Sequence, residues 1–235
     1  MFKKLAFTLA EVLIALVVIG VIAAITVPSL MNNMDNYQYK GALKKNFSSF
    51  SQAFRLAYGY QFYDNYLDWD YAHDNSFTQD VYEKLRQYMN ITKVCGRVHE
   101  NNECFTPVKA KNGKPAKYFT EDGFASNFVH LYTFTLSDGT SVAMDVWMKE
   151  SIKQFAGVEK NLIKETDNLV ILTDVNGQKG PNMLGKDVHL FVLTNKGLVP
   201  AGQDDNSKYC DIKSVDYNYD CTAEMLGRYN NRRYY

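Results

Sequence analysis

A single carboxylate interrupts an apolar stretch near the N-terminus. Glu11 is the only charged residue between Lys4 and Asp35, and residues 7–27 are otherwise almost entirely apolar. A charged side chain within a membrane-spanning helix costs on the order of 2.5 kcal/mol or more, and somewhat less near the interface. A carboxylate at this position needs a binding partner or a function, so Glu11 is the first candidate functional residue.

A second candidate site is the polar segment 174–187, with the sequence DVNGQKGPNMLGKD. Its oxygen-bearing side chains could bind calcium, which prefers carboxylate and amide oxygens. They are Asp174, Asn176, Asn182 and Asp187. The segment is not an EF-hand loop, because Gly177 comes too early and no glutamate closes it. A connection in which Asn, Gly and Pro simply meet turn geometry explains the same residues, and we favour this interpretation over calcium.

Four cysteines form two pairs that are close in the sequence. Cys95 and Cys104 are nine positions apart, and Cys210 and Cys221 are eleven apart. In an exported chain such pairs indicate disulfides, whereas a zinc site would use CxxC spacings, which are absent. Four cysteines allow three pairings, and sequence distance favours Cys95–Cys104 and Cys210–Cys221.

The remaining residues do not predict catalysis. The histidines lack metal-ligand spacing, the LSDGT segment at 136–140 indicates a hairpin turn rather than a nucleophile elbow, and no phosphate-binding glycine loop is present. Acidic and basic residues number 26 each, and this zero net charge argues against a nucleic-acid partner. We expect neither an enzyme nor a cofactor, apart from the calcium considered above.

The element that positions Glu11 is an apolar helix of membrane length. Residues 7–27 would form a helix of about 31 Å, close to the thickness of a bilayer core. Lys3 and Lys4 precede it, and positive charges remain on the cytoplasmic side, so all residues after 27 should lie outside the cytoplasm. The sequence therefore predicts a leader at residues 1–6, a transmembrane helix at 7–28 and an exported remainder.

A second helical pattern follows the apolar one. Residues 29–58 should continue the helix with an amphipathic face, although Pro28 should kink or loosen the junction. The apolar positions recur at spacings of three and four: Tyr39, Leu43, Phe47, Phe50, Phe54 and Ala57. The polar positions expected on other faces are Asn46, Ser49, Gln52 and Arg55.

Residues 59–235 should form an exported α+β head. Segments 129–136 and 141–147 flank an Asp-Gly turn and predict a hairpin, and segments 168–175 and 187–194 predict a second strand pair. We expect an antiparallel sheet of about four strands, a short helix at 77–89, and loops at 95–104 and 109–117. The acidic aromatic segment 63–71 is either an interaction surface or packing under a loop. The tail after Gly202 is polar and should depend on the second cysteine pair for its attachment.

The N-terminal segment KKLAFTLAEVLIALVVIGVIAAITVP resembles the signal of type IV pilins and type II secretion pseudopilins. A short basic leader ends in a small residue and is followed by Phe-Thr-Leu-x-Glu and an unbroken apolar helix. The resemblance implies that a prepilin peptidase cuts between Ala6 and Phe7 and methylates the new Phe7 amine. Ala6 departs from the family pattern, in which Gly is usual. Glu11, Gly20 and Pro28 fall where the family commonly has Glu, Gly and Pro.

The resemblance also implies a fold and a function. The fold would be pilin-like: a long N-terminal helix whose first half spans the inner or cytoplasmic membrane, packed on a small antiparallel sheet. The subunit would polymerise with other pilin-like subunits into a pilus or pseudopilus, with Glu11 of one subunit meeting the Phe7 amine of a neighbour and so setting axial register. The alternative is a minor, pilin-type binding module that uses the same anchor for adhesion or for capture of a substrate or DNA.

Overall fold

The computed structural model describes residues 7–59, 77–97, 103–117, 119–120, 123–124, 131–165, 167–204, 207–212 and 214–227. The chain divides into two compact units, Met1–Gln38 and Tyr39–Tyr235. Several sequence-based expectations concern residues outside the described ranges. These are the leader at 1–6, the acidic aromatic segment 63–71 and the start of the predicted strand at 129–130.

Helix α1 spans Leu9–Tyr58 and includes Pro28. It covers both predicted helical segments, because a proline in mid-helix removes one backbone hydrogen bond without ending a helix that is otherwise favoured. Within the second unit, Leu43, Phe50 and Phe54 are completely buried, as their spacing predicted. The prediction that Asn46 lies on a face away from the core is wrong. It is buried, and its amide nitrogen lies 3.2 Å from Thr140 Oγ1 in the turn between two strands.

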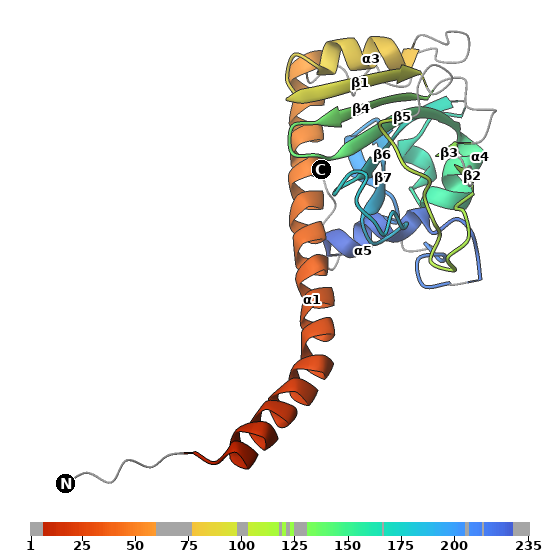
Figure 1. The fold of residues 1–235 in the computed structure, drawn as a ribbon. Helices are drawn as coiled ribbons and strands as arrows, with labels where there is room; N and C mark the ends of the chain where they lie inside the picture. Colours follow the sequence, from red (N-terminus) through yellow and green to blue (C-terminus); the bar gives the residue numbers. More distant parts are fainter. Residues whose placement is uncertain are drawn as a thin grey trace. The chain divides into compact units, whose positions relative to one another are not determined.

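The second unit contains a six-stranded antiparallel sheet with the strand order β1-β4-β5-β6-β7-β8 (Figure 1). The strands are β1 (Ile91–Arg97), β4 (Tyr132–Leu136), β5 (Ser141–Met148), β6 (Asp167–Asp174), β7 (Val188–Thr194) and β8 (Gly197–Pro200). A separate two-stranded ribbon pairs β2 (Phe119–Thr120) with β3 (Gly123–Phe124). The predicted hairpin is present as β4–β5, and the second predicted strand pair is present as β6–β7.

The sheet is larger than the four strands expected. Strand β1 includes Cys95, so the prediction of a loop from 95 onward is wrong for residues 95–97. The register of β1 against β4 is irregular between Ile91 and Lys93 and again between Val94 and Gly96. Such bulges break the strict alternation by which a strand is recognised in a sequence, and this is the reason that β1 escaped prediction.

Alternate residues of the central strands pack into two hydrophobic cores, one on each face of the sheet. The first core contains the buried face of α1 and residues of α3 (Phe77–Leu85), which is shorter than the predicted helix 77–89. The second contains Trp147, Phe155 and Tyr219. It also includes residues of two short helices, η2 (Ile152–Ala156) and η3 (Lys160–Leu162), whereas α4 (Lys149–Ser151), which directly precedes η2, contributes none.

The C-terminal tail docks more firmly than its polar composition suggested. It forms η4 (Tyr219–Cys221) and α5 (Thr222–Leu226), in which Tyr219, Ala223 and Leu226 are buried. The Tyr219 ring meets Trp147 edge to face, with ring centroids 5.2 Å apart. The tail therefore has buried apolar side chains with which to dock, in addition to the second disulfide.

Candidate processing and assembly site

The first turn of α1 is closed by a reciprocal cap between Thr8 and Glu11. The Glu11 carboxylate oxygen Oε2 accepts hydrogen bonds from the Thr8 backbone N–H and from the Thr8 hydroxyl, both at 2.8 Å. The Glu11 N–H lies 3.3 Å from the Thr8 hydroxyl oxygen. This capping box satisfies donors that every helix leaves unpaired at its N-terminus, and it places a negative charge at the positive end of the helix dipole.

Thr8 is a residue that the sequence reasoning overlooked. The signal was present, because Thr-x-x-Glu before an apolar run is a recognisable helix start. Phe7, immediately before the cap, is 85% exposed, so its backbone amine would be accessible if it became the N-terminus. Ala6, the other residue of the expected cleavage site, lies outside the described residues.

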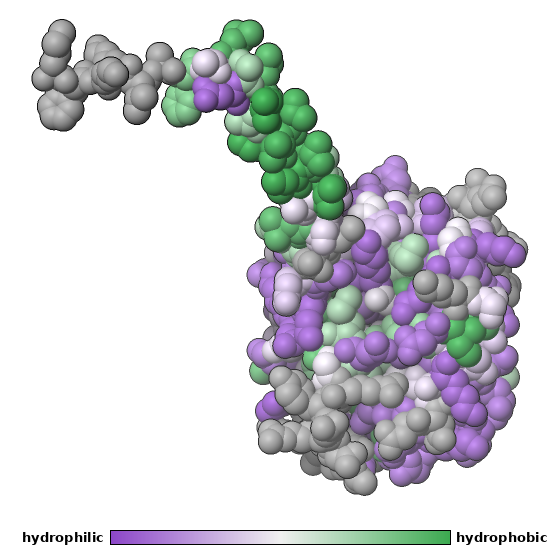
Figure 2. Space-filling view, turned by 90° about the horizontal axis from the view of Figure 1, so that it is seen from below, coloured by the Kyte–Doolittle hydropathy of each residue, from purple (hydrophilic) through white to green (hydrophobic). Residues whose placement is uncertain are grey.

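The apolar part of α1 is exposed along its length. By length and composition it can cross a membrane, and its large hydrophobic side chains from Leu9 to Met34 are exposed (Figure 2). Gly20 lies in this segment, and a Cβ added to it would meet nothing within 4 Å. The single-chain structure thus leaves free the surface that a bilayer or neighbouring helices would cover.

The structure joins the cysteines in local pairs. Cys95 in β1 is bonded to Cys104, with a Cα–Cα distance of 5.8 Å. Cys210 is bonded to Cys221, with a Cα–Cα distance of 4.7 Å. Near the first bond, Lys93 Nζ and Glu103 Oε2 form an ion pair at 2.7 Å between exposed side chains.

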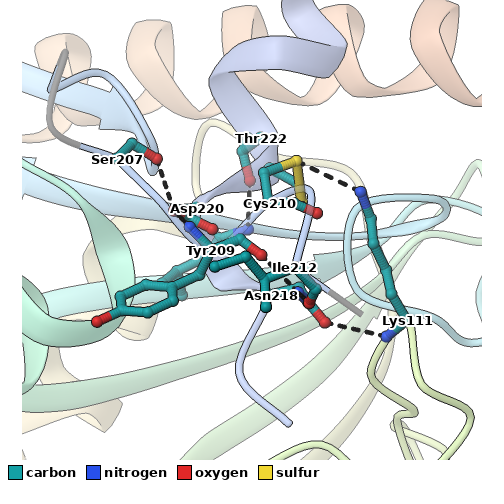
Figure 3. Close-up of a disulfide and its surroundings, with 10 residues drawn as sticks. Lys111, Ser207, Tyr209, Cys210, Ile212, Asn218, Asp220 and Thr222 are labelled. Carbon is teal, nitrogen blue, oxygen red and sulfur yellow. Dashed lines mark hydrogen bonds between the residues drawn. A yellow bond between two sulfur atoms is a disulfide. The ribbon is translucent and has the colours of Figure 1, made fainter. Parts of the chain in front are cut away.

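A hydrogen-bond network surrounds the second disulfide (Figure 3). The Asn218 amide donates to the carbonyl oxygens of Tyr209 and Ile212, and its oxygen accepts from the Lys111 N–H at 3.0 Å. Lys111 Nζ lies 3.4 Å from Cys210 Sγ. Asn218 therefore links the disulfide-closed tail to the segment around Lys111, which is about a hundred residues earlier in the chain.

The backbone of the tail passes so close to residue 202, just after β8, that no side chain fits there. Gly202 has a φ of +86°, and a Cβ there would lie 1.8 Å from the Asp220 carbonyl oxygen. The Asp220 carboxylate accepts hydrogen bonds from the Ser207 hydroxyl at 2.6 Å and the Tyr209 N–H at 2.8 Å. Glycine is required at 202 because both the backbone conformation and the space exclude a Cβ.

The β6–β7 connection brings the four predicted oxygen-bearing residues together. The carboxylate of Asp187 accepts the N–H groups of Asn182 at 2.9 Å and Met183 at 2.7 Å. Asp174 is fully buried, and burial together with the nearby Asp187 carboxylate raises the pKa of Asp174 to about 9. Burial also raises the pKa of Asp187. Two carboxyl groups thus share one buried, oxygen-rich loop.

The α+β architecture, with a long apolar N-terminal helix leading into an antiparallel sheet, is pilin-like. Residues 1–27 match the family model of the prokaryotic N-terminal methylation motif, the prepilin-type motif of type IV pilins and pseudopilins. No curated protein and no solved structure matches the chain. The motif therefore supports a type IV pilin-like or pseudopilin-like subunit, a class of structural rather than enzymatic proteins.

Proposed function

We propose that this protein is a structural subunit that a prepilin peptidase cuts between Ala6 and Phe7 and methylates at Phe7. The mature subunit then polymerises with other pilin-like subunits into a type IV pilus or a type II secretion pseudopilus. The observation that carries the proposal is the methylation motif at residues 1–27, with the Glu11 carboxylate at the start of an exposed apolar helix.

Before assembly, the subunit is held in the inner or cytoplasmic membrane by residues 7–28, with its head outside the cytoplasm. Lys3 and Lys4 support this orientation, since positive residues flank the cytoplasmic end of such helices. The hydrogen bonds from Thr8 lower the cost of placing the Glu11 carboxylate at the membrane, because a hydrogen-bonded charge is cheaper to bury than a free one.

In the fibre, the apolar helices pack side by side and the heads lie outside. Cleavage gives Phe7 a positive amine directly beside the N-terminal end of α1, where the helix dipole is also positive. A neighbour's Glu11 carboxylate compensates this charge. The pair sets axial register because a subunit shifted along the fibre leaves both charges buried without partners.

Glu11 variants test this mechanism. Glu11→Val removes charge and hydrogen-bond acceptors, whereas Glu11→Gln keeps an acceptor for Thr8 but has no charge. Both variants should reach the membrane and remain anchored, and both should lose most sheared fibre on immunoblots. Wild-type fibre yield from Glu11→Gln would contradict charge pairing, and wild-type yield from both would contradict any assembly role for Glu11.

Abundance in the same sheared fraction distinguishes the two roles open to such a subunit. A main structural subunit should dominate the protein in wild-type fibres. A trace amount, incorporated with dependence on Glu11, would instead identify a minor subunit that carries a binding head.

A further inference from the structure

Two segments of the chain have the sequence Asn-x-Ser/Thr with a middle residue other than proline. They are residues 46–48 (Asn-Phe-Ser), which lie in α1, and residues 90–92 (Asn-Ile-Thr), which lead from α3 into β1. This tripeptide is the acceptor sequence for N-linked sugars, and it is used where its asparagine lies on the surface of an exported protein. The position of each asparagine in the fold therefore decides which of the two segments a glycosyltransferase could reach.

The first segment cannot accept a sugar in the folded head. Asn46 is 1% exposed, and its amide nitrogen, the atom that would carry the sugar, lies 3.2 Å from Thr140 Oγ1. A sugar at this position would force α1 away from the sheet, because the neighbouring side chains of α1 belong to the same hydrophobic core as the sheet. Residues 46–48 thus provide an internal control that has the acceptor sequence in a buried position.

Asn90 lies in the opposite environment. It is exposed, and its side chain forms no hydrogen bond with any residue that the structure describes. Its two neighbours, Met89 and Ile91, are partly buried and pack against the core that contains α1. The flanking residues are therefore anchored, while the Asn90 amide remains available at the surface.

Thr92, the third residue of this acceptor sequence, occupies an irregular position in β1. The register of β1 against β4 shifts between Ile91 and Lys93, so the pairing skips Thr92. The Thr92 hydroxyl oxygen lies 3.3 Å from the carbonyl oxygens of Thr135 and Leu136. Both distances exceed the roughly 2.5–3.0 Å that is usual for hydroxyl hydrogen bonds. The hydroxyl that distinguishes an acceptor sequence is therefore only weakly held by the sheet.

The acceptor sequence also lies at the edge of the sheet. Strand β1 is the first strand in the order β1-β4-β5-β6-β7-β8 and pairs only with β4 among the described strands (Figure 1). One backbone hydrogen bond holds Asn90 itself, from the Ser137 N–H to the Asn90 carbonyl oxygen at 2.8 Å. A bulged edge strand opens locally more readily than a central strand, so an enzyme can bind residues 90–92 without disrupting the central strands.

We propose that Asn90 is a site of N-linked glycosylation. In this reaction Asn90 Nδ2 forms a bond to the anomeric carbon of a sugar, and the bond from that carbon to a pyrophosphate group breaks. The pyrophosphate leaves with the electron pair, and the amide releases one proton. The sugar donor is an oligosaccharide carried on a membrane lipid, because sugars linked to nucleotides are confined to the cytoplasm. This choice of donor rests on the proposed function, in which the head lies outside the cytoplasm.

A sugar on Asn90 would protect an exposed part of the head. The backbone of an edge strand can pair with a strand of another chain, and exposed apolar side chains favour such association. Tyr88, two residues before Asn90, is 46% exposed, and Val94 in β1 is 47% exposed. A bulky hydrophilic group between them hinders the approach of another chain to β1.

Peptide mass spectrometry of the full-length protein, isolated from the cells that produce it, tests the proposal. Trypsin cuts after Lys and Arg and so places the two acceptor sequences in separate peptides, 46–55 and 87–93. Peptide 87–93 should be heavier by the mass of one or more sugars attached to Asn90, and peptide 46–55 should be unmodified. An unmodified peptide 87–93, a sugar on Thr92 in place of Asn90, or a sugar on Asn46 would each overturn the proposal.

Variants of the acceptor sequence provide matched controls. Asn90→Gln and Thr92→Val should abolish the added mass, whereas Thr92→Ser keeps the hydroxyl and should retain it. The melting temperatures should match that of the wild type, because Asn90 and Thr92 are both exposed. A sugar that persists in Thr92→Val, or that disappears in Thr92→Ser, would show that the acceptor sequence does not direct the modification.

Two further measurements separate this proposal from the proposed function. The N-terminal peptide of the same sample reports processing, so a chain that begins at methylated Phe7 but carries no sugar on Asn90 overturns the glycosylation alone. When export is blocked, the retained chain should carry no sugar. A sugar on Asn90 of the retained chain would identify a nucleotide-linked donor and contradict transfer from a lipid.

Discussion

Thr8 and Glu11 complete each other's hydrogen bonds at the first turn of α1. Thr8 donates from both its backbone and its hydroxyl to one Glu11 oxygen, and the Glu11 N–H faces the Thr8 hydroxyl. The carboxylate therefore has a partner within its own chain. This internal arrangement holds the carboxylate in position for the proposed pairing with a neighbouring subunit, so Thr8 should influence assembly as well as helix stability.

Thr8→Val should weaken the start of α1 and lower the yield of fibres. Losing the capping hydroxyl costs about 1 kcal/mol of helix stability and leaves the Glu11 carboxylate with fewer hydrogen bonds. Thr8→Ser keeps the hydroxyl and serves as the matched control. Amide hydrogen exchange of residues 9–12 in detergent and the amount of sheared fibre measure the two effects. Equal behaviour of Thr8→Val and Thr8→Ser in both assays would show that the hydroxyl has no role.

Replacing Cys210 and Cys221 by serine should destabilise the head by about 2–3 kcal/mol, because a short disulfide loop constrains the unfolded chain. The loss should be local, since Tyr219 still packs on Trp147. Hydrogen exchange should increase most in residues 207–218, and in residues 43–54 of α1 it should increase by no more than the loss of global stability allows. The double variant of Cys95 and Cys104 should leave the tail protected. Non-reducing peptide maps that link 95 to 210 or 104 to 221, or that find free thiols, would contradict the pairing.

The buried carboxyl of Asp145 should make the stability of the folded head depend on pH. Burial raises the pKa of its carboxyl to about 7, although the Trp147 indole N–H donates to it at 2.9 Å. Because the folded pKa exceeds the ordinary value of 3.8, the stability that protonated Asp145 contributes is complete below pH 4. This contribution to stability decreases as the pH rises above 4 and is lost once the pH passes the folded pKa of about 7.

Asp145→Asn should therefore gain stability relative to the wild type between pH 4 and pH 7, by at most about 3–4 kcal/mol. The asparagine oxygen can still accept the Trp147 hydrogen bond. Urea unfolding at several pH values measures the difference, with Asp211→Asn, an exposed site, as the control. Parallel stability curves for wild type and Asp145→Asn would show that Asp145 ionises normally in the folded head.

The parts of the fold with regular local patterns could be predicted from the sequence. The buried positions Leu43, Phe50 and Phe54 follow helical spacing, and the Asp-Gly turn identifies the β4–β5 hairpin. Strand β1 could not be recognised, because its bulges interrupt alternation. The burial of Asn46 depends on Thr140, a partner that is distant in the sequence and that no local pattern indicates.

The residues of the candidate sites also differ in whether a local sequence pattern reveals them. Glu11 stands out in the sequence because it is a lone charge among apolar residues, and Thr8 could have been found by its capping spacing. The approach of residues 103–117 to the 174–187 loop could not have been predicted, because it depends on backbone hydrogen bonds such as those of Lys109 with Asn182 and Leu184.

Mass spectrometry of the N-terminus shows directly whether the chain is cut and methylated at Phe7. The protein should be extracted from the membranes of cells with an active prepilin peptidase, and from matched cells without one. The chain should begin at methylated Phe7 in the first sample and at Met1 in the second. An intact Met1 in both samples, or a cut near residue 27, would contradict the assignment of this chain as a processed pilin-like subunit.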